Sequence, residues 1–218
     1  MEIKTLGVDG FEYAIAGMRN PMKSYDRADS ERKYYGADSA KGVFKLGEKD
    51  YNLAKQLCKS GSEHRKWMRQ VTVWVEINAP RYWWSEFDTY RIGVSANSES
   101  TMHKLKDENL ALTDFDFDWG TSYIADKAMQ NLVESLRDVR DMMNEADSKD
   151  KDKYLRVLKQ LLPESFRQKR TVCLNYEVLH SMYHQRKKHR LHEWSDTFCN
   201  WVRTLPYSEF ITEEFEQS

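Results

Sequence analysis

Cysteine is scarce in this sequence, and its few copies are poorly placed for a covalent or metal-bound framework. The 218 residues contain three cysteines, Cys58, Cys173 and Cys199, which lie far apart and form no Cys-x-x-Cys pair. An odd number of widely spaced cysteines argues against a disulfide framework or a zinc ribbon, and it predicts reduced thiols in a cytoplasmic protein. We expect these cysteines to act as small apolar packing residues.

Long apolar runs and a net charge are missing as well. No run approaches the ~20 apolar residues of a membrane-spanning helix, and the first ten residues, MEIKTLGVDG, lack the basic start and apolar core of a signal peptide. The 34 basic and 35 acidic residues give a formal net charge of −1, so no overall field attracts nucleic acid. We therefore expect a cytoplasmic protein without a membrane partner, whose ligands are small molecules rather than nucleic acid.

The residues that are present describe one globular domain. Hydrophobic residues make up 40% of the chain and charged residues 32%, which is the balance of a folded protein with a solvated surface. Seven tryptophans suggest stacking surfaces or large interfaces. No internal repeat or long linker divides the chain, so we predict a single domain over residues 1–218.

Hydrophobic periodicity predicts both strands and helices. Valines alternate from residue 70 to Pro80, as in a strand, and apolar residues repeat at helical spacing over residues 125–146. We also expect helices at 50–57, 154–162, 175–185 and 191–204, one or two strands within 3–20, a loop with a short helix at 21–41, a charged connector at 147–153 and a β-prone segment at 171–174. The predicted fold class is α+β, with a largely antiparallel sheet packed with helices.

The most informative stretch is residues 79–104, APRYWWSEFDTYRIGVSANSESTMHK. An aromatic cluster, Tyr82 to Trp84, is followed by many hydrogen-bonding side chains in a short span. Such a concentration is typical of a pocket for a polar, phosphate-bearing ligand. For at least two of the three aromatic residues, packing in the core is the simpler interpretation.

Within this stretch, Ser95-x-Asn97-x-x-Ser100 resembles the second half of the signature of flavin-dependent thymidylate synthases, Arg-His-Arg-x-x-Ser-x-Asn-x-x-Ser-x-Arg. The first three signature positions fall on Tyr90, Arg91 and Ile92, or on Thr89, Tyr90 and Arg91 if one residue is inserted. Two of the three basic residues are therefore replaced. The last Arg position holds Met102.

Three further blocks follow the order of the same family. The first is C-terminal. In it Lys159 precedes a Leu-Pro where the family has an Arg, and Asn175-Tyr-Glu177 stands where the family has Asn-x-Arg. Arg186 lies eleven residues after Asn175, as the family's Arg does. Upstream, residues 60–64, SGSEH, resemble the family's turn, and Ala79-Pro80 ends the strand before the signature. The blocks span more than half of the chain.

The resemblance implies a fold, a reaction and a set of site residues. The fold is that of the thymidylate-synthase-complementing proteins, and the reaction is the reductive methylation of dUMP to dTMP with FAD, NADPH and methylenetetrahydrofolate. No enzyme nucleophile is needed, and members form homotetramers whose flavin pockets are shared between subunits. By resemblance, Arg186 is catalytic; the substrate-binding residues are Lys159, Glu86, Arg91, Ser98, Glu99, Ser100 and Met102; and the cofactor-binding residues are Ser60, Tyr90, Arg91, Asn97, Asn175, Glu177, Ser181 and His189.

Each of these residues also has a structural interpretation. Arg186 can be one solvated charge in the basic run 185–190, and Lys159 can lie on the solvated face of its helix. The polar residues of the signature can cap a helix that begins near Ser100, although a helix N-terminus can itself bind phosphate. Arg81 is a further candidate phosphate ligand or a charge stacked on a neighbouring tryptophan.

The sequence raises three other possibilities, of which the first is a metal site. His180-x-x-x-His184 would place two imidazoles on one helix face, but the sequence suggests no third ligand, and we expect no metal site. The replaced signature residues allow a changed pyrimidine substrate, for example in a nucleotide hydroxymethylation. Basic clusters at 167–170 and 186–190 with aromatic neighbours also allow a non-catalytic nucleotide- or nucleic-acid-binding protein on the same fold.

Overall fold

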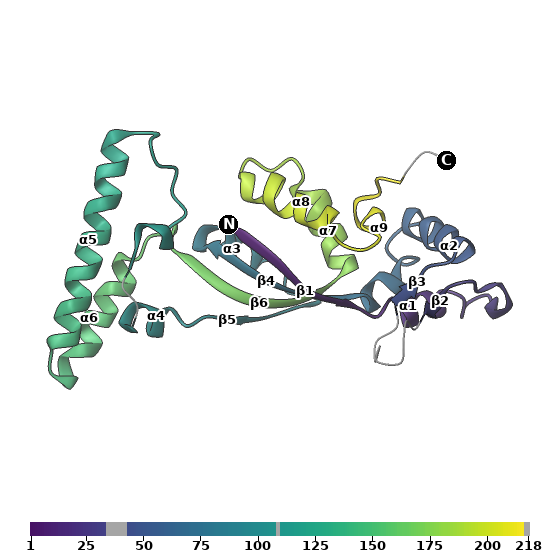
Figure 1. Cartoon of the computed structure of the whole chain (residues 1–218), viewed down its shortest axis with the longest axis horizontal. Helices are drawn as coiled ribbons and strands as arrows, with labels where there is room; N and C mark the ends of the chain where they lie inside the picture. The colour runs from purple at the N-terminus through teal and green to yellow at the C-terminus, as the bar shows by residue number, and fades with distance from the viewer. Residues whose placement is uncertain (34–42, 108–109, 216–218) are drawn as a thin grey trace. The chain divides into compact units, whose positions relative to one another are not determined.

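A computed structural model describes residues 1–33, 43–107 and 110–215 (Figure 1). The chain forms two compact units. The first unit comprises Met1–Glu2, Ile77–Thr89 and Asn97–Thr171, and the second comprises Ile3–Glu76, Tyr90–Ala96 and Val172–Ser218. The single domain expected for residues 1–218 stays a prediction.

The main sheet has four strands in the order β1-β4-β6-β5. These are β1 (Glu2–Asp9), β4 (Thr72–Pro80), β6 (Arg167–Asn175) and β5 (Val94–Ser98). The predicted valine strand is β4, in which Val73, Val75 and Ile77 are buried at every second position. The α+β class is confirmed, and β6 is longer than the β-prone segment that the sequence indicated.

A second, two-stranded sheet was not expected. Its strands β2 (Glu31–Lys33) and β3 (Val43–Lys45) pair antiparallel. In the range 21–41, for which a loop and a short helix were predicted, the structure has the 3₁₀ turn η1 (Tyr25–Arg27) and β2. Residues 34–41 of that prediction lie outside the described residues.

The first unit contains the helices α3 (Arg81–Phe87), α4 (Thr101–Asp107), α5 (Tyr123–Glu145) and α6 (Ser148–Leu161), and the 3₁₀ turn η3 (Leu112–Asp114). The amphipathic helix expected at 125–146 is confirmed as α5, which buries Met129, Val133, Leu136 and Met143. These residues pack in one apolar cluster with Leu158 of α6. The charged connector predicted at 147–153 is wrong.

Residues 148–153 form the first turns of α6, and solvation explains why the prediction failed. Their charges face water, as shown by the 78% exposed side chain of Lys153, which binds Asp150 at 2.6 Å on the helix surface. A charged run at the start of a helix therefore lacks the apolar repeat by which helices are recognised. The helix ends before Pro163, as expected.

The second unit contains α1 (Phe11–Gly17), α2 (Glu48–Lys59), α7 (Tyr176–Arg186), α8 (Cys199–Arg203) and α9 (Glu209–Thr212), with the 3₁₀ turn η2 (Lys66–Gln70) and the π-helical turn η4 (Glu193–Phe198). The helices expected at 50–57 and 175–185 are confirmed as α2 and α7, and residues 191–204 are mainly helical. Among the helices of the described ranges, none has the length and apolar character of a membrane span.

The possible second strand within residues 3–20 is wrong, because the chain turns into α1 after β1. Gly10 has a φ of +96°, and a Cβ at this position would overlap the carbonyl oxygen of Gln70. Beyond it, Phe11, Ala14 and Ile15 are buried on one helical face. Their spacing fits a helix as well as a strand, so the short segment was ambiguous in the sequence.

Candidate functional site

Helix α7 carries three of the nine residues that the sequence assigned to cofactor and catalysis, namely Glu177, Ser181 and Arg186. Asn175 directly precedes the helix, and its side-chain oxygen accepts a hydrogen bond from the Val178 backbone N–H at 3.0 Å, so it is the N-cap of α7. No described residue accepts a hydrogen bond from the Asn175 amide nitrogen. Gly93, with a φ of +75°, approaches so closely that a Cβ would lie 2.9 Å from that nitrogen. The signature segment therefore contacts the start of α7.

Arg186 ends α7 and is held by two aromatic side chains. Its Nε donates to the hydroxyl oxygen of Tyr90 at 3.0 Å, and its guanidinium lies 4.6 Å from the centre of the Trp194 ring. The Tyr90 hydroxyl donates in turn to Gln185 at 2.8 Å. Arg186 is half-buried and oriented, so the interpretation as a freely solvated charge is wrong. We call Tyr90, Gln185, Arg186 and Trp194 the Arg186 cluster.

The sequence had no local signal for the contact between Arg186 and Trp194. The contact arises from the fold of the chain after α7. There the π-helical turn η4 places Trp194 in the interior, where it is 0% exposed. Tyr90 stands at a signature position that is basic in the family. Here its hydroxyl group orients Arg186 instead.

Other expected cofactor residues of the second unit have varied surroundings. Glu177 binds Arg65 at 3.0 Å, and the Ser60 hydroxyl donates to the Gln56 carbonyl at 2.8 Å, which closes the end of α2. His189 accepts a hydrogen bond from the Leu191 backbone through Nδ1 at 3.2 Å. Ser181 is half-buried on α7.

Arg91 differs from these residues because it is exposed and has no polar partner within the described ranges. An exposed guanidinium without a carboxylate partner remains available to an anionic ligand, to which it can donate two parallel hydrogen bonds.

The remaining signature residues lie at an edge of the sheet, in the first unit. Asn97 and Ser98 are exposed on β5, and the Glu99 backbone N–H donates to the Lys169 carbonyl at 2.9 Å. Helix α4 begins at Thr101, directly after Ser100, as expected from the sequence. Met102, at the last signature position, is 46% exposed.

The other two substrate candidates also belong to the first unit. Lys159 is exposed on α6 and makes no polar contact with any residue that the structure describes. Glu86 is half-buried on α3, between core aromatics. Trp83 and Trp84 are fully buried, with ring centres 4.9 Å apart, so the expectation that at least two of the three aromatics belong to the core is confirmed.

The first unit also has a surface cavity of ≈ 350 Å³. It is lined by Arg81, Trp84, Ser85, Asp88, Glu164, Gln168 and Arg170. Arg170 binds Asp88 at 2.7 Å and lies over the Trp84 ring, and Arg81 binds Glu164 at 3.4 Å. Both arginines already have carboxylate partners, which weakens the expectation that Arg81 holds a phosphate.

None of the three thiols has the character of a nucleophile. Burial raises the pKa of Cys58 to about 12 and that of Cys199 to about 11, and burial also raises the pKa of Cys173. All three are free cysteines. A thiol with a raised pKa is protonated near neutral pH and reacts slowly, so the described site offers no cysteine for attack on a substrate.

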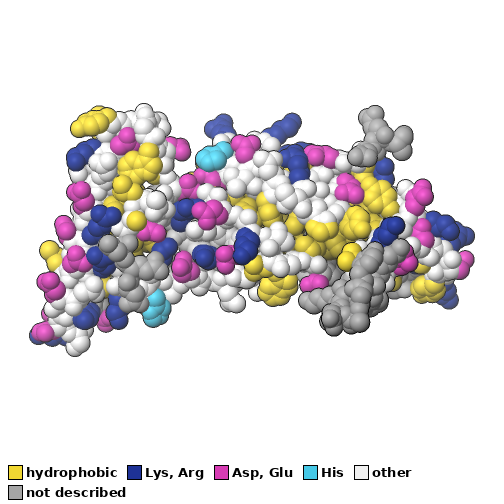
Figure 2. Space-filling model, in the orientation of Figure 1, with side chains coloured by type: hydrophobic (Ala, Val, Ile, Leu, Met, Phe, Trp, Pro, Cys, Tyr) yellow, Lys and Arg dark blue, Asp and Glu magenta, His cyan; other side chains and the backbone are white. Residues whose placement is uncertain are grey.

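Charges of both signs are interspersed among the described residues on the face shown in Figure 2. This distribution agrees with the net charge of −1. It gives no support on that face for the broad basic surface that nucleic-acid binding requires.

This chain is similar to known proteins in its structure but has no match at the level of sequence. No family model matches the sequence, and no curated protein matches it either. The fold, however, is that of the flavin-dependent thymidylate synthases. The similar structures include the enzyme ThyX from Helicobacter pylori complexed with FAD and dUMP, with a TM-score of 0.68, 19% identity and 98% of each chain covered.

A second structure of ThyX from Helicobacter pylori, also with FAD and dUMP, matches with a TM-score of 0.68 and 18% identity over 98% of each chain. The resemblance suggested by the signature is therefore confirmed at the level of the fold.

Proposed function

We propose that this protein is a flavin-dependent thymidylate synthase that methylates dUMP to dTMP, with FAD as cofactor and NADPH and methylenetetrahydrofolate as co-substrates. The observation that carries the proposal is the match over 98% of both chains to an enzyme solved with FAD and dUMP. The order of the sequence blocks supports it, because those blocks include Arg186 and the segment around Tyr90.

Arg186 is the proposed catalytic residue, and its surroundings suit that role. A guanidinium stays charged near neutral pH and can donate two hydrogen bonds to a pyrimidine oxygen as negative charge develops there. Tyr90 at 3.0 Å and Trp194 at 4.6 Å fix its orientation before a ligand arrives. A donor that is already oriented needs little reorganisation in the transition state.

The donor chemistry of the second unit fits a dinucleotide such as FAD. Arg91 offers a guanidinium without a carboxylate partner, and Asn175 offers an amide nitrogen beside the signature segment. Ser60, Ser181 and His189 are the further residues of this unit that would hold the cofactor, and Asn97 is the cofactor candidate of the first unit. Bound FAD would supply the hydride and carry the one-carbon unit.

Two expected cofactor residues have different roles in this proposal. Glu177 neutralises Arg65 at 3.0 Å, and Tyr90 orients Arg186. Either residue can still contact the cofactor through its remaining surface. Arg91 then supplies the main positive charge of the altered signature.

On the substrate side, Lys159 would bind the dUMP phosphate as a point charge, since an ammonium lacks the planar fork of arginine. Its exposure and its lack of a carboxylate partner in the described part of the chain leave it available. Glu86, Ser98, Glu99, Ser100 and Met102 complete the proposed substrate set. We propose that these residues act in a homotetramer, in which different subunits contribute to one pocket.

The altered signature makes a related reaction the second candidate. Met102 offers no charge where the family has an arginine, and Tyr90 is neutral. With fewer charged contacts to the ligand, the related reaction would use a different pyrimidine substrate or form a hydroxymethylated product. The same assay separates the two reactions, because the mass of the nucleotide product distinguishes a methyl from a hydroxymethyl group.

The first experiment is flavin binding by the purified full chain. We expect absorption near 450 nm, roughly where an isoalloxazine absorbs, and a change in this band when dUMP is added. Arg91→Ala should weaken FAD binding about tenfold or more, as expected for loss of a charged hydrogen bond. Arg69→Ala, which removes an exposed arginine of η2, is the matched control.

A colourless protein that takes up no added FAD would overturn the cofactor assignment. A salt-sensitive mobility shift of a single-stranded oligonucleotide without flavin binding would instead support the nucleic-acid-binding alternative.

A further inference from the structure

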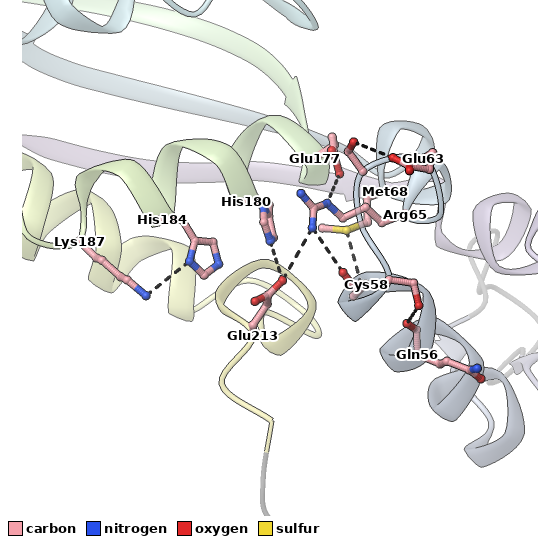
Figure 3. A network of polar contacts seen from close by, with 12 residues as sticks. Gln56, Cys58, Glu63, Arg65, Met68, Glu177, His180, His184, Lys187 and Glu213 are labelled. Carbon is pink, nitrogen blue, oxygen red and sulfur yellow. Dashed lines mark hydrogen bonds and ion pairs between the residues drawn. The ribbon is translucent and has the colours of Figure 1, made fainter.

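Two histidines and a glutamate from distant parts of the chain meet beside α7. His180 and His184 lie one helical turn apart, with ring centres 4.4 Å apart, and Glu213 directly follows α9. His180 Nε2 is 3.0 Å from a carboxylate oxygen of Glu213. Figure 3 shows the two rings side by side on α7 with Glu213 facing them. The sequence suggested no third ligand for the histidine pair, and the fold brings Glu213 to it as a candidate.

The three side chains have the geometry of a metal-binding set. One possible ligand atom from each residue lies within 4.8 Å of the other two. Bonds of ~2.0–2.2 Å to nitrogen and oxygen in tetrahedral geometry would bring ligand atoms to roughly 3.4 Å. The pair His180–Glu213, at 3.0 Å, is already near this separation, and the possible ligand atom of His184 lies within 4.8 Å of both.

Burial gives a second, independent observation. His180 is 7% exposed, and its Nδ1 has no hydrogen-bond partner among the residues that the structure describes. Buried polar atoms without partners are uncommon and usually indicate a water, an ion or a functional role. The Glu213 side chain is 37% exposed, so one side of the cluster remains open to an entering ion and to water.

Glu213 also adopts an unusual backbone conformation, with a φ of +59°. A left-handed conformation is uncommon for a residue other than glycine, and such residues cluster at functional sites. A glycine often takes this position at the end of a helix. Here the position is a glutamate, and its carboxylate lies beside the two histidines.

The surrounding charges are compatible with a cation. Arg65 lies 3.8 Å from Glu213, but Glu177 neutralises it at 3.0 Å. Lys187 is 3.4 Å from His184 Nδ1, and because its side chain is exposed it can move into water. The next residue, Glu214, is not part of this set, because its carboxylate binds Arg203 at 3.3 Å and accepts a hydrogen bond from the Tyr183 hydroxyl at 2.6 Å.

We propose that His180, His184 and Glu213 bind a divalent transition metal of the zinc class, with water completing the coordination. Two imidazoles and one carboxylate form a ligand set that suits Zn²⁺ and Co²⁺. The ion takes the place of the proton shared between His180 and Glu213, and that proton is released to solvent. The metal would link the segment after α9 to α7, the helix that ends at Arg186.

The test uses the full chain, stripped of metal with a chelator and titrated with CoCl₂ and, separately, ZnCl₂. We expect one Co²⁺ per chain with the visible absorption of a tetrahedral nitrogen–oxygen site, displacement of Co²⁺ by Zn²⁺, and a rise in the thermal unfolding midpoint. Glu213→Gln, which keeps shape and hydrogen bonding, and His184→Ala should each weaken binding at least about tenfold. His192→Ala, an exposed histidine outside the cluster, should leave it unchanged.

Three results would overturn the proposal. These are no binding by the unaltered chain, equal binding by Glu213→Gln, or a cobalt spectrum with a sulfur charge-transfer band, which would identify a cysteine ligand. The spectrum of the unaltered chain remains decisive even if His184→Ala fails to fold. The outcome does not depend on FAD, so it is separate from the test of the proposed function.

Discussion

At the scale of single residues, the structure assigns different surroundings to the two proposed substrate cations. Arg186 is oriented by Tyr90 and Trp194, whereas Lys159 is exposed and makes no polar contact within the described ranges. An oriented donor suits stabilisation of a transition state, and an exposed ammonium suits binding of a phosphate. These surroundings predict different kinetic effects when each charge is removed.

Arg186→Ala should lower kcat by about 100-fold or more, the scale of losing one charge-stabilising donor. Lys159→Ala should mainly raise the KM for dUMP, by an amount equivalent to ~1.5–3 kcal/mol, the range for hydrogen bonds to charged groups. Steady-state kinetics with measured flavin content separates the two, and flavin content should be unchanged in both. Unaltered turnover by Arg186→Ala would show that the assignment of α7 is wrong.

The cysteines give a second residue-scale prediction. Because burial raises the pKa of all three thiols, iodoacetamide near neutral pH should leave turnover unchanged in the folded protein. After unfolding, mass spectrometry should find all three thiols labelled. Loss of turnover together with labelling of one native cysteine would point to a thiol-dependent reaction instead.

At the scale of elements, a side chain distant in the sequence accepts hydrogen bonds from the first backbone N–H groups of α2. Asp29 accepts hydrogen bonds from the N–H groups of Lys49 and Asp50 at 2.8 and 3.0 Å. The Asp50 carboxylate binds Arg19 at 2.6 Å with 2% of its side chain exposed, and it accepts the backbone N–H of Ser30 at 2.9 Å. The start of α2 is thus tied to the segment after α1.

This buried pair predicts a pH-dependent stability. Burial alone would raise the pKa of Asp50, but hydrogen bonds from Ser30, Arg19 and the backbone outweigh it and lower the pKa below its usual value. The carboxylate therefore stabilises the fold above the unfolded pKa of ~3.9, and this contribution is lost as pH falls through the lower folded pKa.

Asp50→Asn should destabilise the protein by about 3–5 kcal/mol near neutral pH, because it leaves Arg19 buried without a charge partner. In urea unfolding, the difference from the unaltered chain should shrink below about pH 4, since protonation removes the same charge. Asp26→Asn, at an exposed position of η1, should have little effect at either pH. A pH-independent difference for Asp50→Asn would contradict this explanation.

Elements with a regular apolar repeat were predictable from the sequence, and elements fixed by distant contacts were not. Alternating valines identified β4, and helical spacing identified α5. The first turns of α6 carry charges that face water, and α1 depends on the turn at Gly10 against Gln70. Similarly, residue order suggested Arg186, but only the fold brings Tyr90, Trp194 and Arg186 together, and only the fold brings Glu213 to His180.

At the scale of the whole molecule, the seven tryptophans and two exposed apolar side chains favour an assembly. Tyr123 and Ile124 at the start of α5 are 83% and 80% exposed, which is unusual for large apolar side chains that lie next to each other. We predict a homotetramer with a mass of about four times 25.9 kDa in light scattering at micromolar concentration. A monomeric mass would contradict pockets shared between subunits.

Formation of dTMP is the most direct test of the proposed thymidylate synthase activity. The purified chain, supplied with dUMP, methylenetetrahydrofolate, NADPH and FAD, should produce dTMP, identified by mass, and omission of any one substrate should abolish the product. Arg186→Ala should form it at least about 100-fold more slowly. A hydroxymethylated nucleotide would indicate the related reaction on the same fold. A protein that binds FAD and dUMP and yet forms neither product would contradict the account.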